Sequence, residues 1–368
     1  MRILVLTTDA FGGHGGIAKY NRDLITALCS SPECVEVVAF PRVMPFESEA
    51  LPPRLTYVTR GLGGKLHYVL AVIAEVFRNR KYDIIICGHI NLLPLAIIVK
   101  LWVRSPLLLL LYGIDVWQSH KSNLTNWAIK WVDCFVSISE FTKKKFLTWV
   151  KLSEENVFIL PNAITISDYG IKPKPEALLH RYGLSGATVL MTLGRLSSDE
   201  RYKGIDEVLE ILPELIQQDP QIMYLVVGDG SDRHRLEEKA VVLGISHHVV
   251  FAGLILESEK ADHYRLADVF VMPGYGEGFG FVYLEAMACG VPVVASKLDG
   301  SCEAVRNGEL GVIVDPSSRN ELTAGILEAL DRPKEKIPEG LDYFSYCNFE
   351  RQLLAIISQV VPVKEQQR

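Results

Sequence analysis

Hydrophobic and polar positions alternate along the chain between short apolar runs and longer segments with a helical period. RILVLTT (2–8) leads through a glycine-rich turn into GIAKYNRDLITALCS (16–30), whose apolar residues share one helical face. DIIICGHI (83–90) and PLLLLLYGID (106–115) are nearly continuous apolar runs, as is typical of strands buried on both faces of a parallel sheet. The pattern predicts a doubly wound α/β domain.

The pattern breaks in a linker near 165–180 and then restarts. ATVLMTLGRL (187–196) and IMYLVVGDG (222–230) predict further strands, separated by a helix over 204–218 that bends or breaks at Pro213. This predicts a second doubly wound domain of similar size. Two such sheets facing each other would enclose a deep cleft at the carboxyl ends of their strands, where open α/β sheets bind ligands.

The predicted boundaries follow from these breaks in pattern. Residues 1–168 form the first Rossmann-like domain, on the acceptor side of the cleft, and residues 169–344 form the second, which binds the donor. A final helix over about 345–365 contains FERQLLAIISQVV and has no strand after it. Its apolar face needs a partner, so we expect it to pack back on the first domain.

Charge and cysteine content narrow the classes of partner and compartment. A net charge of −6 does not suggest a protein that binds nucleic acid by displacing counterions. The seven cysteines are scattered without CxxC spacing, as in a reducing cytosolic compartment. The apolar start is too short for a signal peptide. We therefore expect a cytoplasmic protein, and the sequence leaves its oligomeric state open.

The longest apolar region, residues 91–113, is interrupted by Lys100, Arg104 and Pro106. A membrane-spanning helix of about 20 uninterrupted apolar residues does not fit it. The pattern predicts a helix that ends near Arg104 and a buried strand after Pro106. Peripheral contact with the inner face of a membrane stays open, and the TKKKF run at 142–146 is more typical of a solvated helix face.

Three glycine-rich or basic stretches follow predicted strands. DAFGGHGGIAKY (9–20) opens a helix with free N–H groups that favour an anion, although it is not a strict G-x-G-x-x-G fingerprint and a purely structural turn stays open. LGRLSSDERYKG places Arg195 and Lys203 beyond a strand, where two cations suit a diphosphate. In GEGFGFVYLEAMACG (276–290), glycines permit close backbone approach to a phosphate at the helix start.

Two glutamates flank that last turn. Glu285 lies one turn into the helix in an almost entirely apolar setting, so it needs polar partners and suits a ribose diol. Glu277 precedes the turn and suits the far end of a ligand whose phosphates cross the helix start. A solvated helix face is the alternative for Glu285.

GEGFGFVYLEAMACGVPVVAS resembles the E-x7-E signature of the retaining GT-B glycosyltransferases of family 4. Similar pieces occur in family order over nearly the whole chain: GGHGGIAKY, YGIDVW, VSISEFT, LPNAI, LGRL with YKG, VVGDG and FAGL. The resemblance implies the GT-B fold, with two Rossmann-like domains, and transfer of a sugar from a nucleotide diphosphate donor with retention of anomeric configuration.

The resemblance also implies roles for residues of the second domain. Arg195 and Lys203 hold the diphosphate and stabilise the leaving group, and Glu277 binds a donor-sugar hydroxyl, so these three are the expected catalytic residues. Glu285 binds the ribose. The remaining expected donor contacts are made through the backbone, by Gly253 and Leu254 at the base, by Gly278, Phe279, Gly280 and Phe281 around sugar and phosphates, and by Gly15 and Gly16 from the first domain.

In the first domain the chain departs from the family pattern. Many members have a histidine–glycine pair where this chain has Tyr112 and Gly113, followed by an acidic residue that Asp115 resembles. His89 and His14 are then the candidate cleft histidines, each with a bystander role as its alternative. His14, His89, Tyr112 and Asp115 form the expected acceptor side.

No D-x-D pair occurs in the chain, so a divalent cation lacks its usual holder, and we expect neither a metal nor a cofactor. The resemblance implies a same-face displacement in which the leaving phosphate assists deprotonation of the acceptor hydroxyl. Catalysis would then depend on positioning and charge stabilisation.

The motifs do not separate UDP, GDP and ADP donors. We favour a UDP-hexose such as UDP-glucose, and a saccharide or lipid-linked acceptor in polysaccharide or glycoconjugate biosynthesis. There are four alternatives. An oxidoreductase needs the strict glycine fingerprint with its acidic partner, and neither is seen; a phosphorylase needs lysine-bound pyridoxal phosphate. A nucleotide-sugar epimerase would act without an acceptor, and a non-catalytic nucleotide-sugar-binding protein would bind without turnover.

Overall fold

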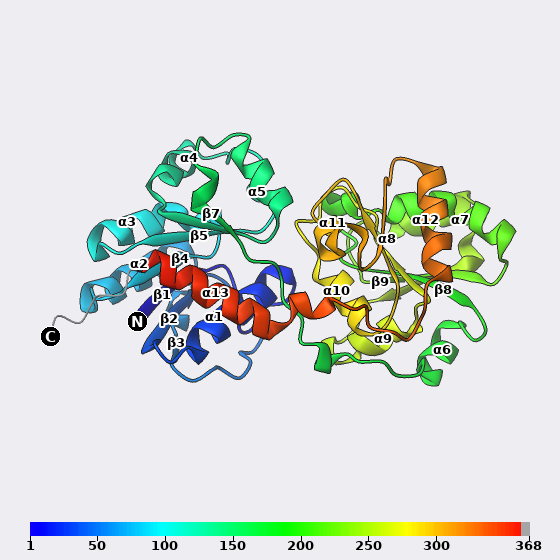
Figure 1. Ribbon diagram of the computed structural model, residues 1–368, viewed down its shortest axis with the longest axis horizontal. Helices are drawn as coiled ribbons and strands as arrows, with labels where there is room; N and C mark the ends of the chain where they lie inside the picture. The colour runs from blue at the N-terminus through cyan, green and yellow to red at the C-terminus, as the bar shows by residue number, and fades with distance from the viewer. Residues whose placement is uncertain (362–368) are drawn as a thin grey trace. The chain divides into compact units, whose positions relative to one another are not determined.

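The computed structural model describes residues 1–361, which form two compact units (Figure 1). Unit 1 contains residues 1–163 together with the C-terminal segment from Tyr346, and unit 2 contains Ile164–Ser345. The division after residue 163 lies five residues before the boundary expected at 168. The last helix, α13 (Tyr346–Val360), belongs to unit 1, and residues 362–365 of the expected helix lie outside the described residues.

Both units are built on parallel sheets, which confirms the doubly wound α/β prediction. Unit 1 has seven strands in the order β3-β2-β1-β4-β5-β6-β7. Their bounds are β1 Arg2–Thr7, β2 Glu36–Pro41, β3 Leu55–Tyr57, β4 Ile84–Cys87, β5 Leu107–Leu111, β6 Cys134–Ser137 and β7 Val157–Ile159. The strand order reverses between β1 and β4, because the chain leaves β1 towards one edge and returns to β4 on the other side.

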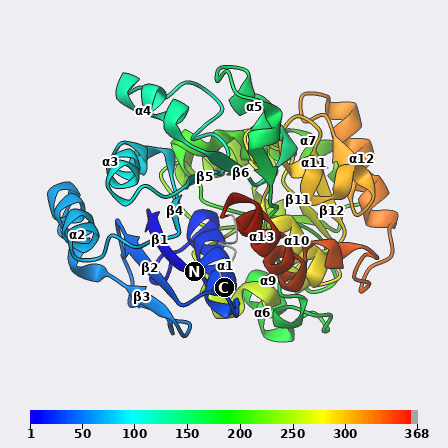
Figure 2. The same ribbon diagram turned by 60° about the vertical axis from the view of Figure 1, so that its left-hand side comes forward.

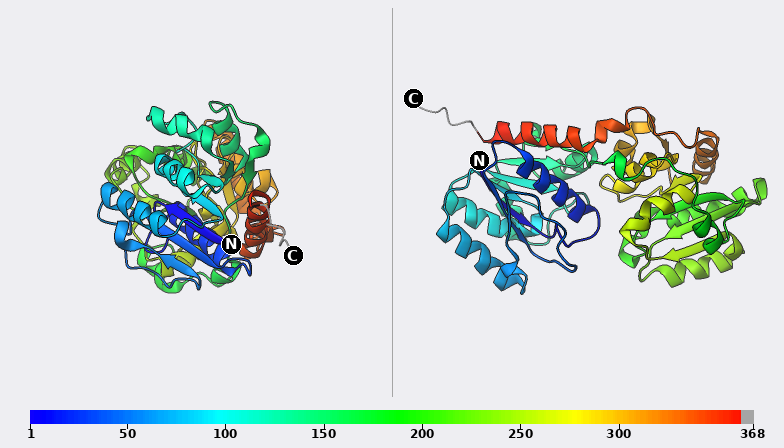
Figure 3. Two further views of the ribbon diagram at one scale, coloured as in Figure 1. Left: turned by 90° about the vertical axis from the view of Figure 1, so that its left-hand side faces the viewer. Right: turned by 90° about the horizontal axis from the view of Figure 1, so that it is seen from below.

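Helices cover both faces of the unit 1 sheet (Figures 2 and 3). The helices are α1 Gly16–Ser30, α2 Lys65–Arg78, α3 Leu93–Val103, α4 Asn123–Ala128, α5 Glu140–Leu147 and α13. On one face α13 packs against α1, and the rings of Tyr20 and Phe349 meet edge to face with centroids 5.5 Å apart. On the other face α2 and α3 cover a large apolar core. Strand residues are therefore apolar on both sides.

Unit 2 has six strands in the order β10-β9-β8-β11-β12-β13. Their bounds are β8 Thr188–Leu193, β9 Ile222–Val227, β10 Val249–Gly253, β11 Val269–Val271, β12 Val293–Ser296 and β13 Val312–Val314. The helices are α6 Glu176–Tyr182, α7 Ile205–Gln218, α8 Arg233–Val242, α9 Lys260–Leu266, α10 Phe281–Ala288, α11 Ser301–Ala304 and α12 Arg319–Asp331. The strand order reverses between β8 and β11.

Local predictions about three segments can be compared with the structure. The region 91–113 forms α3, whose C-cap is Arg104, and then β5, as predicted. Helix α7 continues through Pro213 without a break. The expected linker at 165–180 includes the start of the short helix α6. Among residues 1–361, no helix is both long and apolar enough to cross a membrane.

Candidate functional site

Four side chains of alternating charge meet at the carboxyl end of β8 in unit 2. Lys203 Nζ lies 3.1 Å from Glu277 Oε1 and 3.4 Å from Glu200 Oε2. Glu200 also contacts the guanidinium of Arg195, whose side chain is 78% exposed. We call Arg195, Glu200, Lys203 and Glu277 the charge cluster. It brings together the three residues predicted to be catalytic and adds Glu200, which the sequence analysis did not identify.

The charge cluster lies where the strand order of the sheet reverses. Arg195 and Lys203 follow β8, Glu277 follows β11, and these two strands are neighbours. Loops after such strands diverge to opposite faces of the sheet and leave room for a ligand between them. The two loops are tied together, because the backbone N–H of Tyr275 donates to the carbonyl of Tyr202 over 2.7 Å.

Glycine is required where these two loops touch. A Cβ on Gly276 would lie 2.4 Å from the ring of Tyr202, and one on Gly204 would lie 2.4 Å from the carbonyl oxygen of Pro273. Gly204 also has φ of +82°, which is unfavourable for other residues. The glycines thus let the Lys203 and Glu277 loops approach closely enough for their side chains to pair.

Burial and charge act in opposite directions on Lys203. Burial alone would lower the pKa of its ammonium group, but the carboxylates of Glu277 and Glu200 outweigh that effect and raise the pKa above its ordinary value. Lys203 is therefore a fixed positive charge at neutral pH. A diphosphate at this position would meet a cation that is already oriented, which is the arrangement that stabilises developing negative charge.

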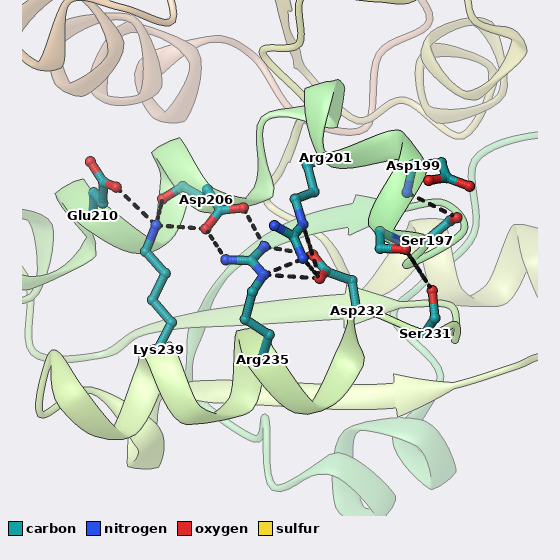
Figure 4. Close-up of polar contacts among 10 residues, drawn as sticks. Ser197, Asp199, Arg201, Asp206, Glu210, Ser231, Asp232, Arg235 and Lys239 are labelled. Atoms are coloured by element: carbon teal, nitrogen blue, oxygen red, sulfur yellow. Dashed lines mark hydrogen bonds and ion pairs between the residues drawn. The ribbon is translucent and has the colours of Figure 1, made fainter.

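An ion-pair network fixes the segment between β8 and α7 that carries Lys203 (Figure 4). Arg201 donates to the carboxylate of Asp232, with the shortest contact at 2.7 Å, and Asp232 is nearly fully buried. Arg235 on α8 bridges Asp232 to Asp206 on α7, and Lys239 continues the network from Asp206. The network joins the 3-10 turn Ser198–Lys203 to two helices, so Lys203 projects from a braced backbone.

The loop carrying Glu277 is held from behind by Asp299. The backbone N–H of Glu277 donates to Asp299 Oδ2 over 2.9 Å, and the N–H of Gly300 donates to the Glu277 carbonyl over 2.8 Å. Asp299 also accepts hydrogen bonds from the hydroxyl and the N–H of Ser301. Burial raises the pKa of Asp299 to about 7, although the bond from Ser301 acts to lower it. Asp299 thus positions the main chain of Glu277.

Helix α10 begins directly after this loop. Its N-cap is Gly280, with φ of +92°, and no side chain caps the helix. The first turn contains no acidic residue, but the Glu277 carboxylate lies nearby: its Oε2 would be 3.9 Å from a Cβ on Gly280. A helix start of this kind favours an anion. Phe279 and Phe281 are buried, and they anchor the backbone around Gly280.

Glu285 is fully buried on α10 and is bonded by residues of α9. Lys260 Nζ lies 2.8 Å from Glu285 Oε2, and the hydroxyl of Tyr264 donates to the same oxygen over 2.8 Å. Burial acts to lower the pKa of Lys260, but Glu285 and Glu257 raise it above the ordinary value. Glu285 is therefore a paired carboxylate and does not lie on a solvated helix face. The sequence analysis did not identify Lys260 or Tyr264.

The two residues expected near the base end β10 and begin the following loop. Gly253 has φ of +76°, and its carbonyl accepts a hydrogen bond from the N–H of Gly228 over 2.9 Å. The side chain of Leu254 is 80% exposed. An exposed apolar side chain beside a strand end is available to a planar base, and the role of both residues stays a prediction.

In unit 1 the first glycine loop connects β1 to α1. Gly15 is the N-cap of α1 with φ of +93°, and Gly16 is the first residue of the helix. A Cβ on Gly15 would meet no atom within 4 Å, so the space beside it is open. His14 is exposed and its ring contacts that of Phe46 with centroids 4.0 Å apart. Arg22 braces the loop by donating to the carbonyl of Gly13 over 2.7 Å.

The other acceptor-side candidates follow β4 and β5. The rings of His89 and Tyr112 are stacked, with centroids 6.5 Å apart. His89 Nδ1 accepts the backbone N–H of Asn91 over 3.1 Å, so in the neutral ring the proton resides on Nε2. Burial, and then His120, lower the pKa of His89 to about 4. At neutral pH its Nε2 is thus a hydrogen-bond donor.

Tyr112 and Asp115 differ in whether their buried polar atoms have hydrogen-bond partners. The Tyr112 hydroxyl is buried and donates to Asn21 Oδ1 over 2.7 Å, so it joins β5 to α1. Asp115 Oδ2 is buried without a hydrogen-bond partner among residues 1–361, and burial raises the pKa of the carboxyl group to about 7. The position of Asp115 therefore leaves one polar atom unused by the described fold.

Two doubly wound units, each with a parallel sheet, have the architecture of the GT-B fold. Residues 184–340 match the family model "Glycosyl transferases group 1", and residues 14–168 match "Glycosyltransferase Family 4". The chain belongs to this family of glycosyltransferases. This confirms the resemblance to the GT-B glycosyltransferases of family 4, and the retaining mechanism stays a prediction.

Several mannosyltransferases are similar to this chain in sequence. A GDP-mannose-dependent alpha-(1-6)-phosphatidylinositol monomannoside mannosyltransferase of Mycolicibacterium smegmatis is 34% identical over 219 residues, which cover 57% of this chain and 56% of that protein. The chain spans about half the length of this relative and of the corresponding protein of Mycobacterium tuberculosis. A GDP-mannose-dependent monoacylated alpha-(1-6)-phosphatidylinositol monomannoside mannosyltransferase of Corynebacterium glutamicum is 27% identical over 92% of this chain and 91% of that protein.

Solved structures share the fold at lower identity. HepE of Anabaena in complex with UDP has a TM-score of 0.75 at 21% identity, covering 98% of this chain and 100% of that chain. Sucrose-phosphate synthase of Thermosynechococcus elongatus has a TM-score of 0.74 at 22% identity, covering 97% and 98%. At this level of identity the similarity establishes the fold alone.

Proposed function

We propose that the protein is a retaining, metal-independent hexosyltransferase that moves a hexose from a nucleoside diphosphate sugar to a saccharide or lipid-linked acceptor. The observation that carries the proposal is Lys203, a braced and largely buried cation at the switch point between Arg195 and Glu277. The start of α10 adds backbone N–H donors from the following loop. Together they suit a diphosphate with a sugar beyond it.

In the proposed reaction the bond between the anomeric carbon and the phosphate oxygen breaks, and the acceptor oxygen bonds to the same face of the anomeric carbon. The acceptor proton passes to an oxygen of the leaving diphosphate. Lys203, Arg195 and the α10 N–H groups stabilise the charge on that diphosphate. Glu277 orients a sugar hydroxyl.

The printed names of the relatives favour one donor for the first assay. The sequence alone favoured UDP-glucose, whereas the mannosyltransferases that are similar to this chain are named as GDP-mannose-dependent and act on phosphatidylinositol mannosides. We therefore propose GDP-mannose as the donor and a phosphatidylinositol mannoside as the lipid acceptor for the first assay, with UDP-glucose as the competing donor. Transfer of labelled hexose to lipid, followed by NMR assignment of the new anomeric centre, tests the proposal. Inversion at that centre would contradict it.

Replacing Glu277 with alanine should mainly remove discrimination among donor sugars. The carboxylate would contact a sugar hydroxyl, so we expect the preference between epimeric hexose donors to fall by about tenfold or more. Nucleoside diphosphate affinity should not fall, and the loss of an anion beside Lys203 should tighten it by at most several-fold. Competition between two donors with the same base measures this. Glu214→Ala, at an exposed position on α7, is the matched control. An unchanged donor preference in Glu277→Ala would contradict the assignment.

Removing divalent cations should leave the transfer rate unchanged. Arg195, Lys203 and the start of α10 would neutralise the diphosphate without a bridging metal. The initial rate measured in excess EDTA should match the rate in magnesium or manganese. A rate that falls in EDTA and returns on adding one of these cations would show that the proposal lacks a metal.

A further inference from the structure

Three neighbouring helices of unit 1 leave large apolar side chains in solvent. On α2, Leu66, Leu70 and Phe77 recur at helical spacing and are 68%, 57% and 54% exposed. They form one stripe along the helix, on the side away from the core residues of α2 such as Tyr68 and Val72. This stripe does not pack against the sheet.

Helix α3 extends the apolar surface. Its exposed residues Ile98, Leu101 and Trp102 lie at i, i+3 and i+4. The ring of Trp102 contacts that of Phe77 with centroids 4.2 Å apart, so the α2 and α3 stripes are continuous. Figures 1 and 2 show α2, α3 and α4 following one another along this unit.

The third part lies on α4 and the turn that follows it. Leu124, Trp127 and Trp131 are exposed at i, i+3 and i+7, and the two indole rings lie 5.6 Å apart. Lys100 of α3 donates to the carbonyl of Trp131 over 2.7 Å, which joins this segment to α3. Three of the five tryptophans of the chain thus share what we call the α2–α4 face.

The segment that forms the α2–α4 face carries more cations than anions. Between residues 65 and 131 the sequence has eight Lys or Arg against three Asp or Glu, although the whole chain has a net charge of −6. Arg78, Arg80, Lys81, Arg104 and Lys130 have no carboxylate within 4 Å among residues 1–361. The guanidinium of Arg80 lies 6.0 Å from the ring centroid of Phe77, so charge and apolar surface adjoin.

The three acidic residues of this stretch do not oppose that charge. Glu75 is buried and paired with Arg60, Asp83 accepts the backbone N–H of Arg2, and Asp115 has a buried carboxylate oxygen. Asp133, just beyond the stretch, is paired with Lys100 at 2.6 Å. The face therefore presents tryptophan, aliphatic side chains and unpaired cations together.

We propose that the α2–α4 face docks on an anionic lipid bilayer. Tryptophan and basic side chains are enriched at the interface of membranes, where the rings enter the headgroup region and the cations meet anionic headgroups. A second copy of the chain is a poorer occupant, because a twofold contact would bring the unpaired cations against their own copies. The inference agrees with a lipid-linked acceptor but rests on unit 1 alone.

Sedimentation with vesicles tests the proposal on the whole protein. The protein should co-sediment with vesicles of phosphatidylcholine that contain about one third phosphatidylglycerol, and much less with vesicles of pure phosphatidylcholine. Added salt should weaken the binding to the anionic vesicles. Trp127→Ser combined with Trp131→Ser should lower the partition coefficient at least about tenfold. Val241→Ser with Val242→Ser, which replaces two exposed valines on α8, is the matched control and should bind as the wild type does.

Circular dichroism and the melting temperature report whether the tryptophan variant is folded. If the variant is misfolded, Arg78→Ser with Arg80→Ser replaces it and should lose most of the preference for anionic vesicles. Equal sedimentation of wild type and both variants would overturn the proposal. So would concentration-dependent dimers, without lipid, that the tryptophan substitutions abolish. If neither the wild type nor any variant binds a nucleotide, the proposed function is overturned, and the conclusion about lipid binding is unaffected.

Discussion

Replacing Lys203 with methionine is expected to lower hexosyl transfer by about 100- to 1000-fold, because it removes a preoriented cation from the leaving diphosphate. The loss has a second component. Without the ammonium group, the Glu277 carboxylate, now 3.1 Å from it, would face an incoming diphosphate, and Glu200, now 3.4 Å from it, would keep only its contact with Arg195. Nucleoside diphosphate affinity should therefore fall together with the rate. Steady-state rates and calorimetric titration measure the two effects.

Glu200→Gln is the informative partner of this variant. Glu200 is an internal anion that occupies both cations of the charge cluster, so its neutralisation should tighten diphosphate binding several-fold, opposite in sign to Lys203→Met. Lys297→Met removes a solvent-exposed lysine paired with Glu321 in the same unit and should change neither quantity. Wild-type affinity for diphosphate in Lys203→Met would remove this residue from the site.

Replacing Glu285 with alanine is expected to destabilise unit 2 by up to about 3–5 kcal/mol, because it leaves the largely buried Lys260 ammonium with only the exposed Glu257, 3.4 Å away, as an ion-pair partner. The melting temperature of unit 2 should fall by roughly 2–4 °C for each kcal/mol. Nucleotide affinity should also fall if Glu285 binds the ribose. The single variant cannot separate the two effects, and two further comparisons do so.

The double variant Glu285→Leu with Lys260→Met removes both charges and should recover most of the lost stability. Its nucleotide affinity should stay low. Ribose and deoxyribose nucleotides give the sharper comparison: the wild type should prefer the ribose form, and the double variant should bind both alike. Recovery of nucleotide affinity along with stability would show that Glu285 acts only within the ion pair.

From the sequence, the site residues that follow strands could be identified, but most of the residues that contact them could not. The runs at β8 and β11 indicated parallel strands, whose carboxyl ends share an edge, so Arg195, Lys203 and Glu277 could be expected near one another. The structure brings Lys203 and Glu277 into contact. Glu200 could have been predicted in the same way, because it precedes Lys203 by three residues in a short turn.

The remaining partners depend on tertiary packing. Lys260 and Tyr264 meet Glu285 only because α9 packs against α10, and no local pattern predicts that contact. Asp299 supports Glu277 because β12 lies beside β11, which brings the loops after both strands together. An aspartate directly beyond a predicted strand was the available signal. The exposure of the apolar residues on α2 to α4 could not be predicted, because an apolar stripe on a helix usually faces the core.

The central claim is that unit 2 binds a nucleoside diphosphate through the charge cluster and the start of α10. Calorimetric titration with GDP, UDP, ADP and NAD, all in EDTA, tests it most directly. We expect micromolar binding of one nucleoside diphosphate, no binding of NAD, and loss of the signal in Lys203→Met. Binding of NAD with all three diphosphates silent would contradict the account, since it would place the nucleotide site at a different glycine loop.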